Sequence, residues 1–233
     1  MSGRVVLIGL RRSRLRQIRE YFAQHQVRKL QVGAGDNPLA GWLNSEGFAP
    51  SSFTHSLKAA RGYLLLDARE PFPFEEASVD YVFHEHVIEH LSYQQGQFMV
   101  AECMRILKPG GRMRVSTPDL AVFVGLFGDD IDKNQQQFLR EYVDFNSRVW
   151  STDLKHVTDN EAVFVLNHNF RAWGHQFIYD YQTLAGLLSE AGFVDIERQS
   201  PQMSSDSHLR GLEARKEFVS IFGSLIVEAS KPR

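Results

Sequence analysis

The stretch Leu30-Gln31-Val32-Gly33-Ala34-Gly35-Asp36-Asn37-Pro38 decides how the rest of the chain is interpreted. A short apolar run enters a Gly-x-Gly turn, which predicts a β-strand that ends in a glycine turn. Because Gly33 and Gly35 lack a Cβ atom, a ligand can come into van der Waals contact with the main chain. The motif is common, and alone it fits a plain tight turn equally well. Its meaning therefore depends on the other segments.

The composition predicts one globular domain over residues 1–233, because 43% of the residues are apolar and 12% are aromatic. The single cysteine, Cys103, excludes an internal disulfide and any multi-cysteine metal site. No apolar run approaches the roughly 20 residues that span a bilayer. Val5–Leu10 runs into Arg11 and Arg12 instead of a small-residue cleavage site. We therefore expect a cytoplasmic protein with no membrane span.

The charge is unevenly distributed. Residues 1–30 carry a net charge of +7 within a chain whose total is −2. Leu15, Ile18 and Phe22 fall on one face of a helix, so residues 1–28 are expected to form a basic helical arm that packs on the domain. Such an arm could meet nucleic acid or an anionic surface. We favour a solvated helix whose charges face the acidic body of the chain.

Short apolar runs alternate with helical stretches along the chain, which is typical of an α/β fold with a mostly parallel sheet. The predicted strands are Lys29–Val32, Gly41–Glu46, Gly62–Leu66, Asp80–His84, Arg112–Ser116, Gly192–Arg198 and Ser224–Ala229. The predicted helices after the basic arm are Val87–Leu91, Gln97–Leu107 and Tyr181–Ala191. Residues 119–179 break this rhythm and are rich in aromatic side chains. We expect them to form a helical, aromatic cap over a substrate pocket, inserted after the fifth strand.

Ligands of open α/β sheets bind beyond the carboxyl ends of the strands, where the strand order reverses. The first predicted strand ends in the glycine turn, and the second ends in Glu46, which could accept both hydroxyls of a ribose. The third ends in Asp67, which could accept from an exocyclic amine, and the fourth ends in His84, Glu85 and His86. Together these groups indicate a cofactor that carries a nucleoside.

The motifs at these positions are GAGDNP, GWLNSE, LLLDAREPFPF, SVDYVFHEHVIEHL and ECMRILKPGGRMRVSTPD. In this order they resemble class I S-adenosylmethionine-dependent methyltransferases, most closely the small bacterial proteins related to the type 11 group. The resemblance is strong from Leu30 to Asp119 and looser from Asn167 to Lys231. It implies a Rossmann-like seven-stranded, mostly parallel sheet whose final strand, Ser224–Ala229, is antiparallel. It also implies S-adenosylmethionine as the cofactor.

The resemblance implies that the cofactor-binding residues are Gln31, Gly33, Ala34, Gly35, Glu46, Asp67, Ala68, His84 and Glu85, with Asn44 as a second candidate for the ribose. The family usually has an acid where this chain has Gln31 and often a glycine where it has Asn37. Gln31 can still hydrogen-bond an ammonium or a water, and we expect Gln31→Glu to tighten cofactor binding. Too few residues separate Gly35 from Glu46 for a full crossover helix, so a vestigial connection is expected.

Methyl transfer needs a base only when the acceptor must lose a proton. Among His84, Glu85, His86, Asp119, His168 and His175, we favour His86 and His168 as catalytic bases. Arg171 is the expected substrate anchor, because its planar fork binds two oxygens at once. Asp119, Trp173 and His175 are the other expected substrate contacts.

Residues His86 to His90 also fit the His-x-x-Glu-His pattern of inverted zinc peptidases. That fold needs a third ligand on a following helix, whereas the flanking segments here belong to a sheet protein. We therefore expect no metal.

The sequence thus predicts methyl transfer to a hydroxyl or amine of a polar small molecule, such as a sugar or polysaccharide precursor. One alternative is a methyltransferase for RNA or another polyanion that uses the basic arm. Another is a relative that binds the cofactor without catalysis. We expect a small-molecule substrate and no nucleic acid, and we leave a homodimer open.

Overall fold

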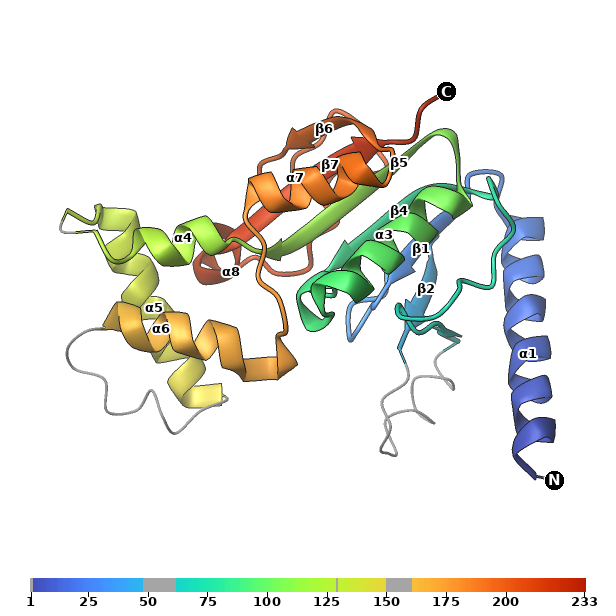
Figure 1. Ribbon diagram of the computed structural model, residues 1–233, viewed down its shortest axis with the longest axis horizontal. Helices are drawn as coiled ribbons and strands as arrows, with labels where there is room; N and C mark the ends of the chain where they lie inside the picture. Colours follow the sequence, from blue (N-terminus) through green and yellow to red (C-terminus); the bar gives the residue numbers. More distant parts are fainter. Residues whose placement is uncertain (1, 48–61, 129, 150–160) are drawn as a thin grey trace.

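A computed structural model describes residues 2–47, 62–128, 130–149 and 161–233 (Figure 1). Its centre is a seven-stranded sheet with the order β3-β2-β1-β4-β5-β7-β6. The strands are β1 (Lys29–Val32), β2 (Leu43–Glu46), β3 (Leu64–Leu65), β4 (Val79–Glu85), β5 (Leu107–Pro118), β6 (Val194–Arg198) and β7 (Ser224–Ser230). Strands β1 to β5 pair in parallel, and β7 is antiparallel to both β5 and β6. The predicted fold class is confirmed.

The helices are α1 (Ser2–Gln24), α3 (Tyr93–Ile106), α4 (Leu120–Gly125), α5 (Lys133–Val149), α6 (Glu161–Arg171), α7 (Tyr181–Glu190) and α8 (Phe218–Phe222). Two 3₁₀ turns, η1 (Ile88–His90) and η2 (Ala172–Gly174), join them. The prediction of separate helices at Val87–Leu91 and Gln97–Leu107 was wrong in its boundaries. Ser92 and Gln95 form a capping box that starts α3 at Tyr93, so only η1 remains of the first helix.

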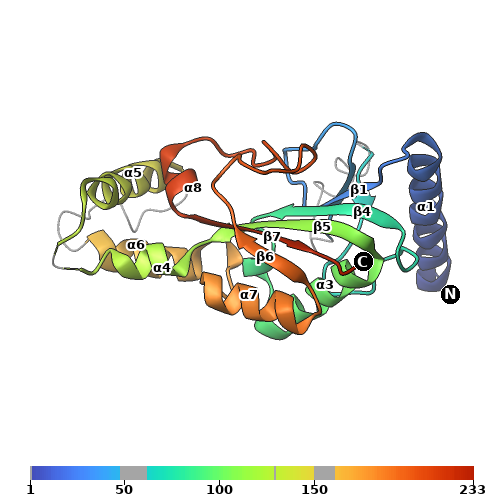
Figure 2. The same ribbon diagram turned by 90° about the horizontal axis from the view of Figure 1, so that it is seen from above.

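The main hydrophobic core lies between the sheet and the helices α3 and α7, which cover one of its faces (Figure 2). It includes Leu30, Val82, Val115, Ile106 and Leu187. The opposite face is covered by the loop 199–217, which adds a small cluster of Leu209 and Leu212 against Phe83. The two faces of the sheet are therefore covered by different kinds of structure.

Buried charges hold the loop 199–217 to the sheet. Arg114 of β5 is fully buried and donates from Nε to Glu213 Oε1 at 2.6 Å. Its Nη1 donates to Glu228 Oε1 of β7 at 2.5 Å and to the Met203 carbonyl at 2.8 Å. A buried ion is tolerated only when it is paired and hydrogen-bonded. The guanidinium thus fixes both ends of the loop over β5.

The helices α4, α5 and α6 extend beyond the end of the sheet and have a hydrophobic core of their own (Figure 1). Phe123, Phe138, Tyr142 and Val165 form this core, and Phe222 of α8 packs against it. The described part of residues 119–179 is thus a helical, aromatic unit, as expected. Residues 129 and 150–160 of it lie outside the described residues.

Helix α1 lies at the opposite end of the molecule (Figure 1). Ile18 and Tyr21 are buried in the main core, and the Lys29 N–H donates to the Tyr21 hydroxyl at 3.0 Å. In the described residues, α1 is thus a helix that packs on the domain through Ile18 and Tyr21. No helix in the described parts of the chain is both long and apolar enough to cross a bilayer.

We predict that Arg114→Met lowers the free energy of unfolding by about 3–5 kcal/mol, because it leaves the Glu213 carboxylate buried without its cation. Urea denaturation at neutral pH measures the change. Arg16→Ala is the control, since the Arg16–Glu20 pair is 70% and 62% exposed and is expected to contribute less than about 1 kcal/mol. Equal effects of both substitutions would contradict the role given to Arg114.

Candidate active site

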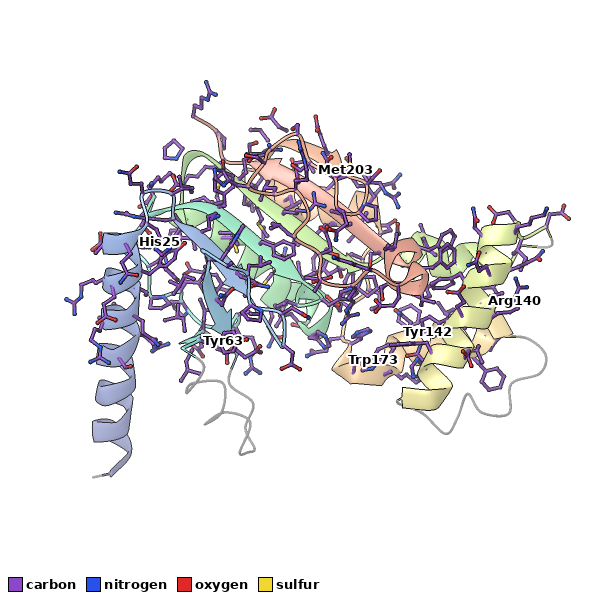
Figure 3. All side chains as sticks on the ribbon, turned by 180° about the vertical axis from the view of Figure 1, so that it is seen from behind. His25, Tyr63, Arg140, Tyr142, Trp173 and Met203 are labelled. Carbon is purple, nitrogen blue, oxygen red and sulfur yellow. The ribbon has the colours of Figure 1, made fainter. Side chains whose placement is uncertain are left out.

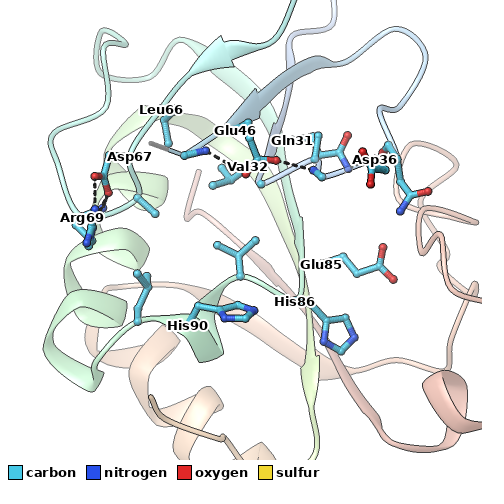
Figure 4. Close-up of a pocket in the computed structure, with 18 of the residues that line it drawn as sticks. Gln31, Val32, Asp36, Glu46, Leu66, Asp67, Arg69, Glu85, His86 and His90 are labelled. Atoms are coloured by element: carbon cyan, nitrogen blue, oxygen red, sulfur yellow. Dashed lines mark hydrogen bonds and ion pairs between the residues drawn. The ribbon is translucent and has the colours of Figure 1, made fainter. Parts of the chain in front are cut away.

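A cavity of about 600 Å³ opens at the carboxyl ends of β1 and β4 (Figure 4). Val32 pairs with His84, so the two strands end at the same level. The chain leaves β1 toward β2 and leaves β4 toward β5, and this divergence is the switch point where α/β sheets bind ligands. The lining residues are Gln31–Asn37, Glu46, Gly47, Leu66–Arg69, Glu85–Val87, His90, Leu91 and Arg215. We call this space the donor cavity.

The glycine turn forms one wall of the donor cavity. Gly33 has φ +67°, and a Cβ atom on it would lie 2.4 Å from Val87 Cγ2, so only glycine fits. Glu46 holds the turn from β2, because its Oε2 accepts from the Gly35 N–H at 2.7 Å and its Oε1 from the Gly47 N–H at 3.2 Å. An ionised carboxylate offers about four lone pairs, so Glu46 can still accept from hydroxyl groups.

Asp67 and Arg69 form another wall of the donor cavity (Figure 4). Arg69 binds the Asp67 carboxylate with both Nε, at 2.9 Å, and Nη2, at 2.7 Å. This hydrogen bonding lowers the pKa of Asp67 below its usual range. The ionised carboxylate next to the buried Ala68 is a suitable acceptor for an exocyclic amine.

A second cavity, of about 550 Å³, lies between the sheet and the helices α4 to α6. Its lining is His86, His90, Pro118, Phe123, Phe138, Tyr142, Phe145, Asn146, Asn169, Trp173, His175, Arg215, Glu217, Val219, Ser220 and Gly223. Tyr142 and Trp173 lie on the side of the helical unit that is nearer the sheet (Figure 3). His86, His90 and Arg215 line both spaces, so the two cavities meet there. We call the second space the acceptor cavity.

His86 stands at this junction in a rare backbone conformation. Its φ is +53°, and its N–H donates to the Ser116 carbonyl at 2.9 Å. Nδ1 lies 2.8 Å from Glu89 Oε1, and Nε2 is buried with no hydrogen-bond partner among the described residues. A carboxylate on Nδ1 fixes the proton there and leaves the Nε2 lone pair free. This is the arrangement of a general base.

Comparison with known proteins agrees with this geometry. Residues 30–115 match the family model described as a methyltransferase domain, of the type 11 group. The predicted resemblance to S-adenosylmethionine-dependent methyltransferases is thereby confirmed.

A probable S-adenosylmethionine-dependent methyltransferase from Mycolicibacterium smegmatis is 53% identical over 51 residues, which are 22% of this chain. The match spans only 19% of that relative's length. Among solved structures, an S-adenosylmethionine-dependent methyltransferase from Thermotoga maritima, a possible histamine N-methyltransferase, has a TM-score of 0.49 at 18% identity and covers 95% of this chain and 91% of its own. Another from Archaeoglobus fulgidus has a TM-score of 0.47 at 13% identity, and the match covers 94% of this chain and 92% of that protein. Similarity at this level says nothing about the acceptor.

Within the donor cavity, Gln31 has a structural role that the sequence did not indicate. It is 3% exposed, and its Nε2 donates to the Asn37 carbonyl while its Oε1 accepts from the Leu39 N–H, both at 3.1 Å. Asn44 Oδ1 accepts from the same Leu39 N–H at 2.9 Å and does not line the donor cavity. The structure thus places the Asn44 side chain in the connection between β1 and β2, outside the donor cavity. The two amides hold the helix-free connection between β1 and β2, which is vestigial as expected.

His84 also lies outside the donor cavity. It is fully buried and absent from the cavity lining, because successive side chains of β4 point to opposite faces and Glu85 takes the cavity side. Burial lowers the pKa of His84 to about 4, so the ring is neutral. The other predicted cofactor residues, Gln31, Gly33, Ala34, Gly35, Glu46, Asp67, Ala68 and Glu85, all line the donor cavity.

In the acceptor half, Trp173 and His175 line the cavity, whereas Asp119, His168 and Arg171 do not. Asp119 is buried, caps α4 through the Ala121 N–H at 3.0 Å and pairs with Arg198. Arg171 is exposed outside both cavities. His168 lies behind the lining, with Nδ1 3.1 Å from the Tyr142 hydroxyl and its ring against Trp173.

The sequence also missed two polar groups of the acceptor cavity. Asn146 is 2% exposed, and its Oδ1 has no hydrogen-bond partner among the described residues. Arg215 reaches both cavities from the loop 199–217. Asn146 sits on a helix face and Arg215 in a polar loop, and no local pattern marks either one.

We now predict that Gln31→Glu does not tighten cofactor binding. The change removes the donor to the Asn37 carbonyl and places an anionic oxygen there, at a cost of about 1–3 kcal/mol in the free energy of unfolding. Thermal unfolding with and without S-adenosylhomocysteine measures both effects. Gln26→Glu, at an exposed position, is the control. Tighter binding in Gln31→Glu would restore the role first given to this position.

Proposed function

We propose that the chain transfers the methyl group of S-adenosylmethionine to a hydroxyl or amine of a polar small molecule held in the acceptor cavity. The observation that carries the proposal is the junction of the donor and acceptor cavities at His86, His90 and Arg215. Methyl transfer is an in-line displacement, and its rate depends mainly on holding nucleophile, carbon and sulfur in line. Two contiguous cavities of suitable size supply that alignment.

In the donor cavity, the Gly33–Gly35 turn admits the methionine part of the cofactor, Glu46 accepts from the ribose hydroxyls, and Asp67 accepts from the adenine amine. Bound there, the cofactor would supply its methyl group: a lone pair of the acceptor atom would form the new bond to the methyl carbon, and the electron pair of the broken carbon–sulfur bond would stay on sulfur. A hydroxyl acceptor gives its proton to His86 Nε2, which has no other partner among the described residues.

The acceptor cavity suits a polar ring. Phe145, Tyr142 and Trp173 offer aromatic surfaces on which a ring can stack, and Asn146, Asn169 and Arg215 offer donors and acceptors for its edge. A sugar or a polysaccharide precursor has ring faces that can stack on aromatic side chains and hydroxyl groups along its edge that can hydrogen-bond. We propose a cytoplasmic setting, as the sequence led us to expect, and leave a homodimer open.

A nucleic acid acceptor is the second candidate, based on the basic arm. Helix α1 lies at the end of the molecule opposite the helical cap (Figure 1). A strand bound along α1 would thus lie far from the acceptor cavity. An affinity for RNA that falls steeply as the salt concentration rises would favour this alternative. Cofactor binding without methyl transfer to any acceptor would instead favour a non-catalytic relative.

Calorimetry with S-adenosylhomocysteine tests the proposal. We expect binding at one site per chain and a loss of about 10- to 100-fold in affinity in Glu46→Gln, because one charged hydrogen bond contributes about 1.5–3 kcal/mol. Glu190→Gln, at an exposed helix end, is the matched control. No binding by the unmodified chain at millimolar ligand would overturn the proposal.

A further inference from the structure

The junction of the two cavities holds a group of side chains that methyl transfer itself does not require. Ligand atoms of Glu89, His90 and His175 all lie within 4.8 Å of one another. We propose that these three residues bind one divalent transition-metal ion, and Zn²⁺ is the ion used to test this. The coordination positions that the protein leaves open would face the acceptor cavity. The sequence led us to expect no metal, because the segments that flank His86–His90 belong to a sheet protein. His175, the third residue of the group, comes from a segment far along the chain.

Backbone hydrogen bonds bring the ligands together. The Glu89 carbonyl accepts from the N–H groups of Gln176, at 2.7 Å, and Phe177, at 3.2 Å. The Gln176 side chain donates to the His90 carbonyl at 2.7 Å. The turn η1 is therefore joined directly to the segment that follows η2, and the rings of His90 and His175 meet edge to face with centroids 4.9 Å apart. The cluster is preorganised by the chain itself.

His175 makes the hydrogen bond that usually orients a metal-binding histidine. Its Nδ1 lies 2.6 Å from the Asn169 carbonyl, which can only accept, so Nδ1 carries the proton and Nε2 keeps a lone pair. Metal-binding histidines typically donate their other ring nitrogen to a carbonyl or carboxylate in this way.

Glu89 supplies a buried negative charge that lacks a permanent cation. Its side chain is 0% exposed, and the described residues give it no Lys or Arg partner, only His86 at 2.8 Å. A buried carboxylate needs a counter-charge. Each Glu89 oxygen makes one hydrogen bond, to His86 or to the Thr117 hydroxyl, and keeps a lone pair for an ion.

The donor set selects the kind of ion. Two imidazole nitrogens with one carboxylate oxygen suit Zn²⁺ and neighbouring first-row ions, whereas Mg²⁺ and Ca²⁺ prefer oxygen alone. Two ligand atoms that are each about 2.1 Å from one ion lie at most about 4.2 Å from each other. The ligand atoms here lie within 4.8 Å of one another, so small side-chain rotations would bring them to binding distance. Fewer than four protein ligands leave room for a water or a substrate oxygen.

The position of the site gives it a role that rests on the proposed function. His90 lines both cavities and His175 lines the acceptor cavity, so an acceptor oxygen can reach the open positions. Coordination to a divalent ion makes a hydroxyl easier to deprotonate. The ion would thereby orient the acceptor and make its hydroxyl proton easier for His86 to remove.

The test measures Zn²⁺ binding by chelator-treated full-length protein, without any methyl acceptor. Calorimetry and metal analysis should give one ion per chain, and Co²⁺ in place of Zn²⁺ should give a ligand-field spectrum. We expect His90→Gln and His175→Gln each to weaken Zn²⁺ binding by at least 10- to 100-fold. His25→Gln, at the far end of the molecule, is the matched control and should bind as the unmodified chain does.

S-adenosylhomocysteine binding by the same variants separates the two proposals. Variants that keep this binding but lose Zn²⁺ show that the fold is intact and support the site. Zn²⁺ binding by a chain that binds no cofactor would support the site while the proposed function fails. No Zn²⁺ bound at micromolar free metal, or binding that survives both His90→Gln and His175→Gln, would overturn the inference. Mg²⁺ binding equal to that of Zn²⁺ would overturn it as well.

Discussion

The buried carboxylate of Glu89 is the group on which the geometry of the site depends. Its two oxygens accept from His86 and from the Thr117 hydroxyl of β5, and its carbonyl accepts from the two N–H groups that follow the helical cap. One residue thus connects the end of the sheet, the turn η1 and the returning chain. A buried carboxylate without partners costs several kcal/mol, so Glu89 is stable in this position because His86 and Thr117 hydrogen-bond to it. These contacts fix where the donor and acceptor cavities meet.

The fold could be predicted from the sequence because each strand is encoded by its own residues. Short runs of Val, Leu and Ile between turn signals located every strand, and the resemblance supplied the final antiparallel one. The helices were less certain. Two helices were predicted at Val87–Leu91 and Gln97–Leu107, but the Ser92–Gln95 capping box starts α3 at Tyr93. A serine three residues before a glutamine is a helix-start signal that the sequence contains.

The donor half of the site could be predicted because its groups follow directly after strands. Even there, the sequence did not say which face of a strand meets the ligand, and this is why His84 was mistaken for a cavity residue beside Glu85. The acceptor half depends on how helices of the cap pack on one another. Arg171 and Asn146 both lie on cap helices, and only tertiary packing turns Asn146 into the cavity and Arg171 out of it.

The loop 199–217 couples the stability of the fold to the site. It covers a face of the sheet with few apolar contacts, so buried charge pairs to Arg114 hold it in place. Removing one partner of such a buried pair is costly because the other charge is then left unpaired. The same loop donates the Ala214 N–H to Glu85 at 3.0 Å and carries Arg215 to the junction of the cavities. Arg114 lines neither cavity, but by holding the loop 199–217 in place it helps to position Arg215, which lines both.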